Sequence, residues 1–201
     1  VEADDVIAYL SKSVITHPKD KSFIVSSDKD FLQLVDENVV VYRPMEKEYY
    51  TPQTVIDKYK LSPHNFILHK TLLGDNSDKI KGVKGLGEKG LLKKFPELIE
   101  KDMSWGDILN ICEEKISEHL VYARIIHGRD DLEKNYKIMD LSNPMLSKED
   151  KIWLDEIVAS DNLPYYPDQF VSMYNEDQIG GLIRNVEFWV KDCFNNLVIK
   201  K

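Results

Sequence analysis

Cysteine, long apolar runs and zinc-type spacings are scarce in this 201-residue sequence. The two cysteines, Cys112 and Cys193, lie far apart and fit no CxxC spacing, which favours a reducing compartment with two free thiols. The five histidines show no ligand spacing either. No apolar run approaches the ~18 residues that a membrane span needs, and no signal-peptide pattern opens the chain. We therefore expect no membrane partner.

An excess of positive charge is also lacking, because 35 acids outnumber 27 lysines and arginines and the net charge is −8. That balance argues at first against a nucleic-acid partner. The charges are separated along the chain, however. Seven acids fall into three tight clusters, whereas residues 79–95 hold six lysines and one acid, Glu88. Such a local cationic segment can hold a polyanion on a protein that is acidic as a whole.

The sequence also lacks a first methionine, and a cluster of acids stands at its very start, in VEADD. Domains usually open with expendable residues. We therefore expect this chain to be the later part of a longer protein. The earlier part either belongs to the same protein and was lost, cleaved or omitted, or is supplied by a separate N-terminal partner.

The apolar spacing predicts an alternation of helices and strands. We expect a helix over residues 1–15, strands over 22–27 and 38–42 with a short helix between them, and an edge strand over 46–50. Further helices are expected over 51–59, 62–74, 87–95, 104–128, 147–158 and 179–194. The predicted N-caps are Thr51 and Ser62, each followed by proline, and Gly74 is expected to end its helix.

Acidic residues cluster at three places where a site can form. The clusters are Glu2, Asp4 and Asp5; Asp28 and Asp30; and Asp75 and Asp78. Glu2 and Asp5 are three apart on the first predicted helix and share a face, with Asp4 to the side. The second cluster follows the C-terminal end of a predicted strand, where ligands of open α/β sheets bind. The third follows a helix C-terminus, whose negative dipole end makes bare carboxylates unfavourable.

Each acidic cluster has an ordinary explanation when taken alone. A DxD sequence after a strand occurs in phosphatases, glycosyltransferases and plain loops, acids in a first helical turn suit the helix dipole, and GDNSD fits turn chemistry. Three such clusters in this order, followed by a phosphate-binding loop, are much less expected by coincidence. Converging carboxylates repel one another unless a cation neutralises them. Oxygen ligands favour Mg²⁺ or Mn²⁺ over zinc, so we predict a site for divalent metal.

A glycine-rich turn, GVKGLGEKG, follows the last acidic cluster. We expect Gly85 and Gly87 to allow close approach of backbone, with Leu86 packed between two helices. The N–H groups that open the second helix then suit a phosphate. This is a helix-hairpin-helix pattern, which binds nucleic-acid backbone without reading bases. It is neither a dinucleotide fingerprint nor a P-loop, because no βαβ unit surrounds it and no Gly-Lys-Ser/Thr follows.

The predicted fold class is α/β: the remainder of a doubly wound parallel sheet, followed by a mostly helical region with a helix-hairpin-helix. A buried parallel strand such as 22–26 needs a neighbour on each side, so we expect the missing strands to precede Val1. We expect three parts. These are residues 1–60, part of a metal-binding α/β domain; 61–139, the helix-hairpin-helix region; and 140–201, a mainly helical acidic extension.

Three stretches together resemble the 5′ nuclease superfamily in order and spacing: VEADDVIA, SSDKDFLQLV and LLGDNSDKIKGVKGLGEKG. The members of this family are the flap endonucleases, the 5′–3′ exonuclease domain of bacterial DNA polymerase I, and the phage 5′ exonucleases and ribonuclease H. The resemblance covers roughly residues 1–128 and is greatest to a phage or small bacterial version. The family's early strand aspartate, second N-terminal aspartate and helical arch have no counterpart in this sequence.

The resemblance implies a two-metal centre and a DNA-binding hairpin. Glu2 and Asp4 resemble ligands of the first metal, and Asp5 resembles the acid that links the two sites. The acids that would complete the centre are Asp28, Asp30, Asp75 and Asp78. Two Mg²⁺ or Mn²⁺ ions ~4 Å apart would activate a water for in-line attack, and in relatives the hairpin carbonyls hold K⁺. The predicted DNA-binding residues are Lys81, Gly82, Lys84, Gly85, Gly87, Lys89, Lys93 and Lys94.

The leading functional hypothesis is a structure-specific 5′ nuclease, a 5′–3′ exonuclease or flap endonuclease of replication or repair. Its expected substrates are DNA 5′ ends, flaps and duplex junctions, with RNA of RNA–DNA hybrids as a further option. The second hypothesis is a DNA-binding fragment of such a nuclease, catalytically incomplete without its N-terminal part. A DxD phosphatase or sugar transferase is the third. We expect a cytoplasmic location, in a bacterium or a phage-infected host. The acidic region 140–201 either docks a replication protein or covers the helical core.

Overall fold

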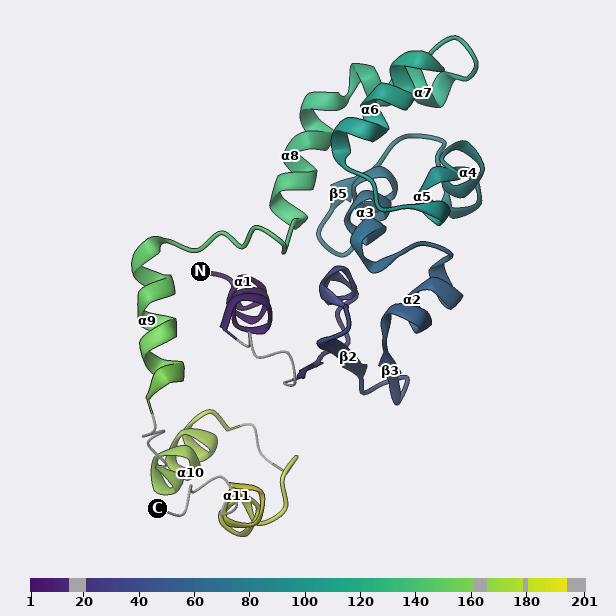
Figure 1. Cartoon of the computed structure of the whole chain (residues 1–201). Coiled ribbons are helices and arrows are strands. Elements are labelled where there is room, and N and C mark those ends of the chain that lie inside the picture. Colours follow the sequence, from purple (N-terminus) through teal and green to yellow (C-terminus); the bar gives the residue numbers. More distant parts are fainter. Residues whose placement is uncertain (15–20, 161–165, 179–180, 195–201) are drawn as a thin grey trace. The chain divides into compact units, whose positions relative to one another are not determined.

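The computed structural model describes residues 1–14, 21–160, 166–178 and 181–194. The chain divides into two compact units, Val1–Leu154 and Asp155–Lys201 (Figure 1). The strands are β1 (Ser22–Val25), β2 (Val39–Arg43), β3 (Glu48–Tyr50), β4 (Gly74–Asp75) and β5 (Ile80–Lys81). None of the described helices combines the length and the apolar character that crossing a membrane requires.

Helices make up most of the remaining described chain. In the first unit they are α1 (Ala3–Tyr9), α2 (Pro52–Tyr59), α3 (Phe66–Leu73), α4 (Glu88–Lys94), α5 (Glu97–Glu100), α6 (Trp105–Glu114), α7 (Leu120–His127) and α8 (Arg129–Met139). Helix α1 continues as a π-helical turn, Leu10–Val14, and the 3₁₀ helices are η2 (Asp30–Leu34) and η3 (Pro63–Asn65). Helix α9 (Lys148–Ala159) runs from the first unit into the second, which also contains α10 (Pro167–Glu176) and α11 (Val186–Phe194).

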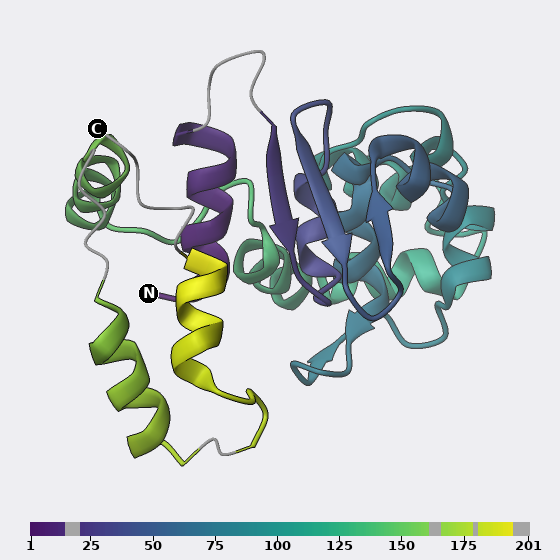
Figure 2. The same ribbon diagram turned by 90° about the horizontal axis from the view of Figure 1, so that it is seen from below.

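The main sheet has the strand order β1-β2-β3 (Figure 2). Strand β1 pairs in parallel with β2, with Ser22 opposite Val39, and β3 pairs antiparallel with β2, with Tyr49 opposite Tyr42. The mixed α/β fold with a parallel strand pair, followed by a mostly helical region, is therefore confirmed. The expectation that the first strand is buried on both faces is wrong for the described structure. Ile24 is buried, but Phe23 and Val25, whose side chains point to the other face of the sheet, are 57% and 66% exposed.

Two apolar clusters stabilise the first unit. One joins the sheet to α1, η2 and α2, and its members include Ala8, Ile24, Leu32, Val41, Val55, Phe66 and Leu141. The other joins α3 to the helices that follow it, and its members include Leu72, Leu86, Leu91, Phe95, Ile108, Tyr122 and Leu132. Leu86 therefore packs in the helical core as predicted. The sheet cluster also includes Leu141, which follows α8. The first compact unit extends to Leu154, past residue 139, where the sequence suggested a boundary.

The predicted caps form. The Thr51 hydroxyl accepts the N–H of Thr54 at 3.3 Å, and the Ser62 hydroxyl accepts that of Asn65 at 3.4 Å. Gly74, at φ 81°, ends α3 as expected.

The prediction of one helix over 104–128 is wrong, because α6 ends at Glu114 and a new helix, α7, begins at Leu120. The His119 side chain accepts the N–H of Val121 at 3.1 Å and so caps this second start. Helix α7 ends at His127 with Gly128 as its C-cap, so the predicted helix end is confirmed. A further helix, α8, begins at Arg129 directly after this glycine and was not predicted.

In the second unit α10 was not predicted, and α11 begins later than the predicted residue 179. Residues 179–180, like residue 15 at the end of the first predicted helix, lie outside the described residues. The α10 and α11 helices pack through aromatic rings, with the centroids of Phe170 and Trp189 6.0 Å apart. The extension is therefore helical, as expected.

Two glycines bring the chain into very close contact where α3 meets the hairpin that follows it. Strands β4 and β5 pair antiparallel, with Gly74 opposite Lys81. A Cβ on Gly82 would lie 2.1 Å from the carbonyl carbon of Leu73 and 2.4 Å from the N of Gly74. Because these neighbours are backbone atoms, they cannot move aside. The sequence assigned Gly82 to DNA binding, and the structure gives it a packing reason as well.

We therefore expect Gly82→Ala to destabilise the chain by about 3 kcal/mol, because the new methyl group overpacks a rigid backbone contact. Gly90→Ala in α4 is the matched control. Its Cβ would meet only Leu86 Cδ1, at 3.6 Å, and alanine should stabilise the helix by about 0.5–1 kcal/mol. Urea unfolding followed by circular dichroism measures both. Equal stability of the two variants would contradict this account.

Candidate active site

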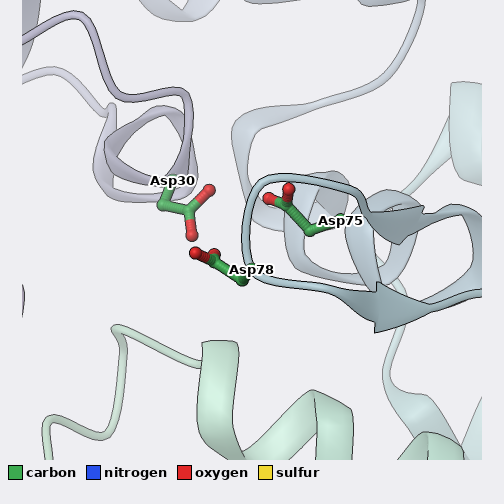
Figure 3. A group of neighbouring side chains, drawn as sticks. All are labelled: Asp30, Asp75 and Asp78. Atoms are coloured by element: carbon green, nitrogen blue, oxygen red, sulfur yellow. The ribbon is translucent and has the colours of Figure 1, made fainter.

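Three aspartates from two separate parts of the sequence converge beside the hairpin. Asp30, Asp75 and Asp78 each place one carboxylate oxygen within 4.8 Å of the others. Figure 3 shows their side chains turned toward one another, Asp30 from η2 and the other two from the β4–β5 hairpin. Two of the three predicted acidic clusters therefore meet.

The Asp28–Asp30 pair is positioned by the end of β1. The parallel ladder continues one step beyond the strand, with Ser26 N donating to Tyr42 O at 3.0 Å. The Asp28 carboxylate then accepts the N–H of Asp30 at 2.8 Å, which turns the chain into η2. Asp28 is exposed and Asp30 is half-buried. The sheet thus presents both acids at the carboxyl end of a parallel strand, as predicted.

The turn between β4 and β5 positions the other two acids. The Asp75 carboxylate accepts the backbone N–H of Ser77 at 2.8 Å and also the Ser77 hydroxyl. Burial by itself would raise the pKa of Asp75. The hydrogen bonds from Lys70 and Ser77 outweigh burial and hold this pKa well below its ordinary value. Asp75 is therefore ionised at neutral pH, as a metal ligand must be.

Lys70 is the main site residue that the sequence reasoning missed. Its side chain is only 9% exposed, and its ammonium contacts both Asp30 and, at 2.5 Å, Asp75. A buried lysine needs such partners, because an unpaired buried charge is costly. The signal available in the sequence was a lysine on α3 between the apolar residues Leu68 and Leu72, five residues before Asp75.

The acids of α1 lie at the edge of this group. Burial raises the pKa of Asp4, and the nearby charges of Asp28, Glu2, Asp5 and Asp78 raise it further. Asp5 accepts the backbone N–H of Met145 at 2.9 Å, and Glu2 is exposed at the helix start. Within the first predicted cluster, Asp4 therefore interacts electrostatically with acids of both other clusters, while Asp5 has a structural contact.

We expect Asp4→Asn to raise the melting temperature of the metal-free chain by about 1–2 °C, since it removes part of the carboxylate repulsion. The sign follows from the raised pKa. An acid that holds its proton more tightly when folded makes the folded state less stable once pH rises above that pKa. Differential scanning calorimetry at pH 7 in chelator measures the change.

In Mn²⁺ we expect Asp4→Asn to melt at a lower temperature than the wild-type chain. The variant has lost a negative charge near the metal site, so binding of the cation stabilises it less. The control is Asp130→Asn, which removes an acid that is 85% exposed on α8. If Asp4→Asn lowered the melting temperature in chelator, crowding of the acids would not be the cause of the shift.

A cavity of about 630 Å³ opens next to the acids. Its lining includes Asp28, Asp30 and Asp75, together with Lys70 and His69. Burial lowers the pKa of His69, partly offset by Glu88, whose carboxylate lies 4.0 Å from His69 Nε2. His69 is therefore neutral at pH 7. The charged side chains of the lining are Asp28, Asp30, Asp75 and Glu88 together with Lys29, Arg43 and Lys70.

The chemistry of these residues fits a divalent oxygen-liganded cation. Carboxylates from separate segments crowd together, and burial followed by their repulsion raises the pKa of Asp4. The carboxylates of Asp30, Asp75 and Asp78 are the ligands that Mg²⁺ or Mn²⁺ prefers. Lys70 balances part of this charge but contacts only two of the three acids.

The glycine-rich turn lies between β5 and α4. Gly85 has φ 82°, a conformation that favours glycine, while Gly87 has φ −122° and open space where a Cβ would stand. The fold of the turn thus does not require glycine at position 87. The missing side chain leaves the backbone exposed at the surface of the turn. Four of the five predicted lysines are exposed on this segment: Lys81, Lys84, Lys89 and Lys93. Lys94 lies partly over the ring of Tyr122.

Two side chains from later helices hold the turn, and sequence reasoning missed both. Arg124 of α7 donates to the carbonyl of Lys84 at 2.7 Å, and Asn135 of α8 donates to that of Lys81 at 3.2 Å. Nothing in the local sequence links these positions to the turn, because the partners are 40 and 54 residues apart. Their effect is to fix the backbone that would face a phosphate.

Sequence comparisons identify related proteins. A family model described as the 5′-3′ exonuclease N-terminal resolvase-like domain matches residues 1–60. A 5′-3′ exonuclease of Aquifex aeolicus is 37% identical over 157 residues, which is 74% of this chain and 49% of that protein. The thermostable DNA polymerase I of Thermus thermophilus is 36% identical over 135 residues, which is 62% of this chain and 15% of that protein. The chain thus spans about half the length of the Aquifex exonuclease.

Solved structures share the fold. The flap endonuclease of bacteriophage T5, as a pseudo-enzyme–product complex with DNA and metal ions, matches with a TM-score of 0.60 and 23% identity. The match covers 88% of this chain and 59% of that one. A mutant T5 5′-exonuclease matches with a TM-score of 0.59 and 22% identity, over 88% of this chain and 66% of that one.

Proposed function

Because the chain belongs to the 5′ nuclease superfamily, we propose that it acts in a structure-specific 5′ nuclease that hydrolyses phosphodiester bonds in DNA with the help of divalent metal. The supporting observation is the convergence of Asp30, Asp75 and Asp78 directly before an exposed lysine-rich turn. Asp78 and Gly82 are four residues apart in the sequence. A DNA strand bound to the glycine-rich turn would therefore pass close to the clustered aspartates. Crowded carboxylates alone would repel DNA, whereas carboxylates loaded with metal would attract a phosphate.

The residues of the chain have separate parts in this reaction. Asp30, Asp75 and Asp78 would hold a metal ion, and we propose that Glu2, Asp4, Asp5 and Asp28 would complete a two-metal centre. When bound, such a metal pair stabilises the developing charge on the phosphate and lowers the pKa of an attacking water. Lys70 fixes the orientations of Asp30 and Asp75, and the exposed lysines of the turn hold the neighbouring phosphates.

Several finer points belong to the same proposal. The metal is Mg²⁺ or Mn²⁺, on the ground of the all-oxygen ligands. A K⁺ ion at the glycine-rich turn would strengthen phosphate binding there. We propose DNA 5′ ends, flaps and duplex junctions as substrates, RNA in hybrids as a secondary substrate, and action in the cytoplasm. Docking of a replication protein on the C-terminal helices remains a prediction.

A second candidate is a DNA-binding fragment that cannot cleave by itself. It is favoured by the length comparison, since the chain spans 49% of its Aquifex relative. In this case the lysine turn would bind DNA while the metal centre lacked ligands from elsewhere.

A cleavage assay separates the two candidates. The chain is incubated with a labelled 5′-flap duplex and with a blunt duplex, in Mg²⁺, in Mn²⁺ and in chelator. The proposal predicts metal-dependent cutting near the flap junction and none in chelator. Binding of the flap duplex without cutting would select the second candidate, and absence of both binding and cutting would reject the family-based assignment of function.

A further inference from the structure

A short segment between α8 and α9 contacts two of the elements that carry the clustered acids. At one end, Met139 and Leu141 are hydrogen-bonded to Gln33 of η2. At the other, the backbone N–H of Met145 is bonded to Asp5 of α1. We call residues 139–145 the strap. It lies more than 100 residues from η2 and from α1 in sequence.

Gln33 binds the strap with both polar atoms of its amide. Its Nε2 donates to Met139 O at 3.0 Å, and its Oε1 accepts Leu141 N at 3.0 Å. The strap is buried at this point, with Met139 4% and Leu141 7% exposed. Buried backbone groups need partners, and here a single side chain satisfies two of them.

The strap keeps its shape through Asp140. The carboxylate of Asp140, which is 8% exposed, accepts Ser142 N at 3.0 Å, Ser142 Oγ at 2.5 Å and Asn143 Nδ2 at 2.9 Å. This local turn joins the Gln33 contact to the Met145 contact. Both oxygens of the Asp140 carboxylate accept hydrogen bonds within the strap, so we assign this acid a structural role.

Gln33 is close to the metal site through helix geometry. In a 3₁₀ helix, side chains three residues apart lie on the same edge, so Gln33 and Asp30 share one edge of η2. Holding Gln33 therefore limits rotation of η2 about its axis, and this rotation would move the Asp30 carboxylate away from Asp75 and Asp78. The hydrogen bond from the Met145 N–H to Asp5 limits movement of the start of α1 in the same way.

We propose that Gln33 is a positioning residue, which acts through the strap to hold Asp30 in the geometry that binds metal. This inference rests on the proposed function, because it assumes that the acids bind a divalent ion. Gln33 itself contacts no acid among the described interactions; it fixes the element that carries one. The strap makes the metal site depend on the backbone beyond α8.

The test compares Gln33→Met with Gln53→Met in the full chain. Methionine keeps the length of the side chain but removes both hydrogen bonds. Gln53 is the matched control, because its amide also donates a hydrogen bond, to Asp57 at 2.8 Å, on the exposed face of α2. Calorimetric titration with Mn²⁺, at a temperature where both variants are folded by circular dichroism, gives the metal affinity. Binding of a DNA duplex in chelator reports on the lysine turn.

We expect Gln33→Met to weaken Mn²⁺ binding about 10-fold, the loss typical when the support of a metal ligand is removed. DNA affinity in chelator should stay unchanged, and Gln53→Met should match the wild-type chain in both measurements. A Gln33→Met variant with wild-type Mn²⁺ affinity would overturn the proposal. A wild-type chain that did not bind Mn²⁺ at all would overturn the proposed function first, so the two failures are distinguishable.

A second pair of variants tests the other end of the strap and serves if Gln33→Met does not fold. Met145→Pro removes the N–H that Asp5 accepts, and Met145→Ala keeps it. The proposal predicts weaker Mn²⁺ binding for proline and wild-type binding for alanine. Equal affinity of these two variants would show that the strap does not position the acids.

Discussion

Replacing Asp30 and Asp78 together by asparagine is expected to reduce metal-dependent cleavage about 10³-fold, with DNA binding retained. Asparagine preserves the size of each side chain and removes the negative charge that a cation needs. Lys70 keeps its 2.5 Å contact with Asp75 in this variant, so the buried ammonium is not left without a partner. Asp78 is exposed, and its replacement leaves the core unchanged.

The measurement is the single-turnover rate on a 5′-flap duplex at saturating Mg²⁺, with binding measured separately in chelator. The matched control is Asp130→Asn with Asp131→Asn, which removes two acids that are 85% and 88% exposed on α8. It should cleave at the wild-type rate. Wild-type cleavage by the Asp30 and Asp78 double variant would mean that the converging acids are not the catalytic centre.

Reversing the charge of Lys84 and Lys89 is expected to weaken duplex binding about 100-fold at moderate salt and to lower the slope of log affinity against log salt by about 2. Each lysine that neutralises a phosphate releases about one counterion, so two lost contacts remove about two from the slope. Both side chains are exposed, and the backbone of the turn is held by the bond from Arg124 to the Lys84 carbonyl. The fold should therefore survive the two Lys→Glu changes.

Fluorescence anisotropy with a labelled duplex over a series of salt concentrations gives both quantities. Lys47→Glu with Lys148→Glu is the control, because these exposed lysines lie on the β2–β3 turn and on α9. Its salt slope should equal that of the wild-type chain. If the two pairs of variants lost affinity equally, the loss would reflect net charge and not a local binding surface.

Where local sequence encodes a structural feature, prediction from the sequence succeeded. The caps at Thr51 and Ser62 depend on residues three positions away, and both form. The DxD acids follow a parallel strand because apolar β-formers precede them, and the turn at Asp75 follows from Gly74. Gly128 ends α7 as predicted, but α8, which begins directly after it, was not predicted.

The sequence alone determined the candidates for the proposed chemistry: three clusters of carboxylates and a lysine-rich glycine turn, each a short local pattern. The tertiary structure decided which of them meet and what holds them. It brought Asp30 to Asp75 and Asp78, set Lys70 between two of them, and fixed η2 through Gln33 and the turn through Arg124. Apart from the nearby pair of Lys70 and Asp75, these contacts join segments 40 to 106 positions apart. No local periodicity encodes them, because they arise only when the two apolar cores close around the backbone.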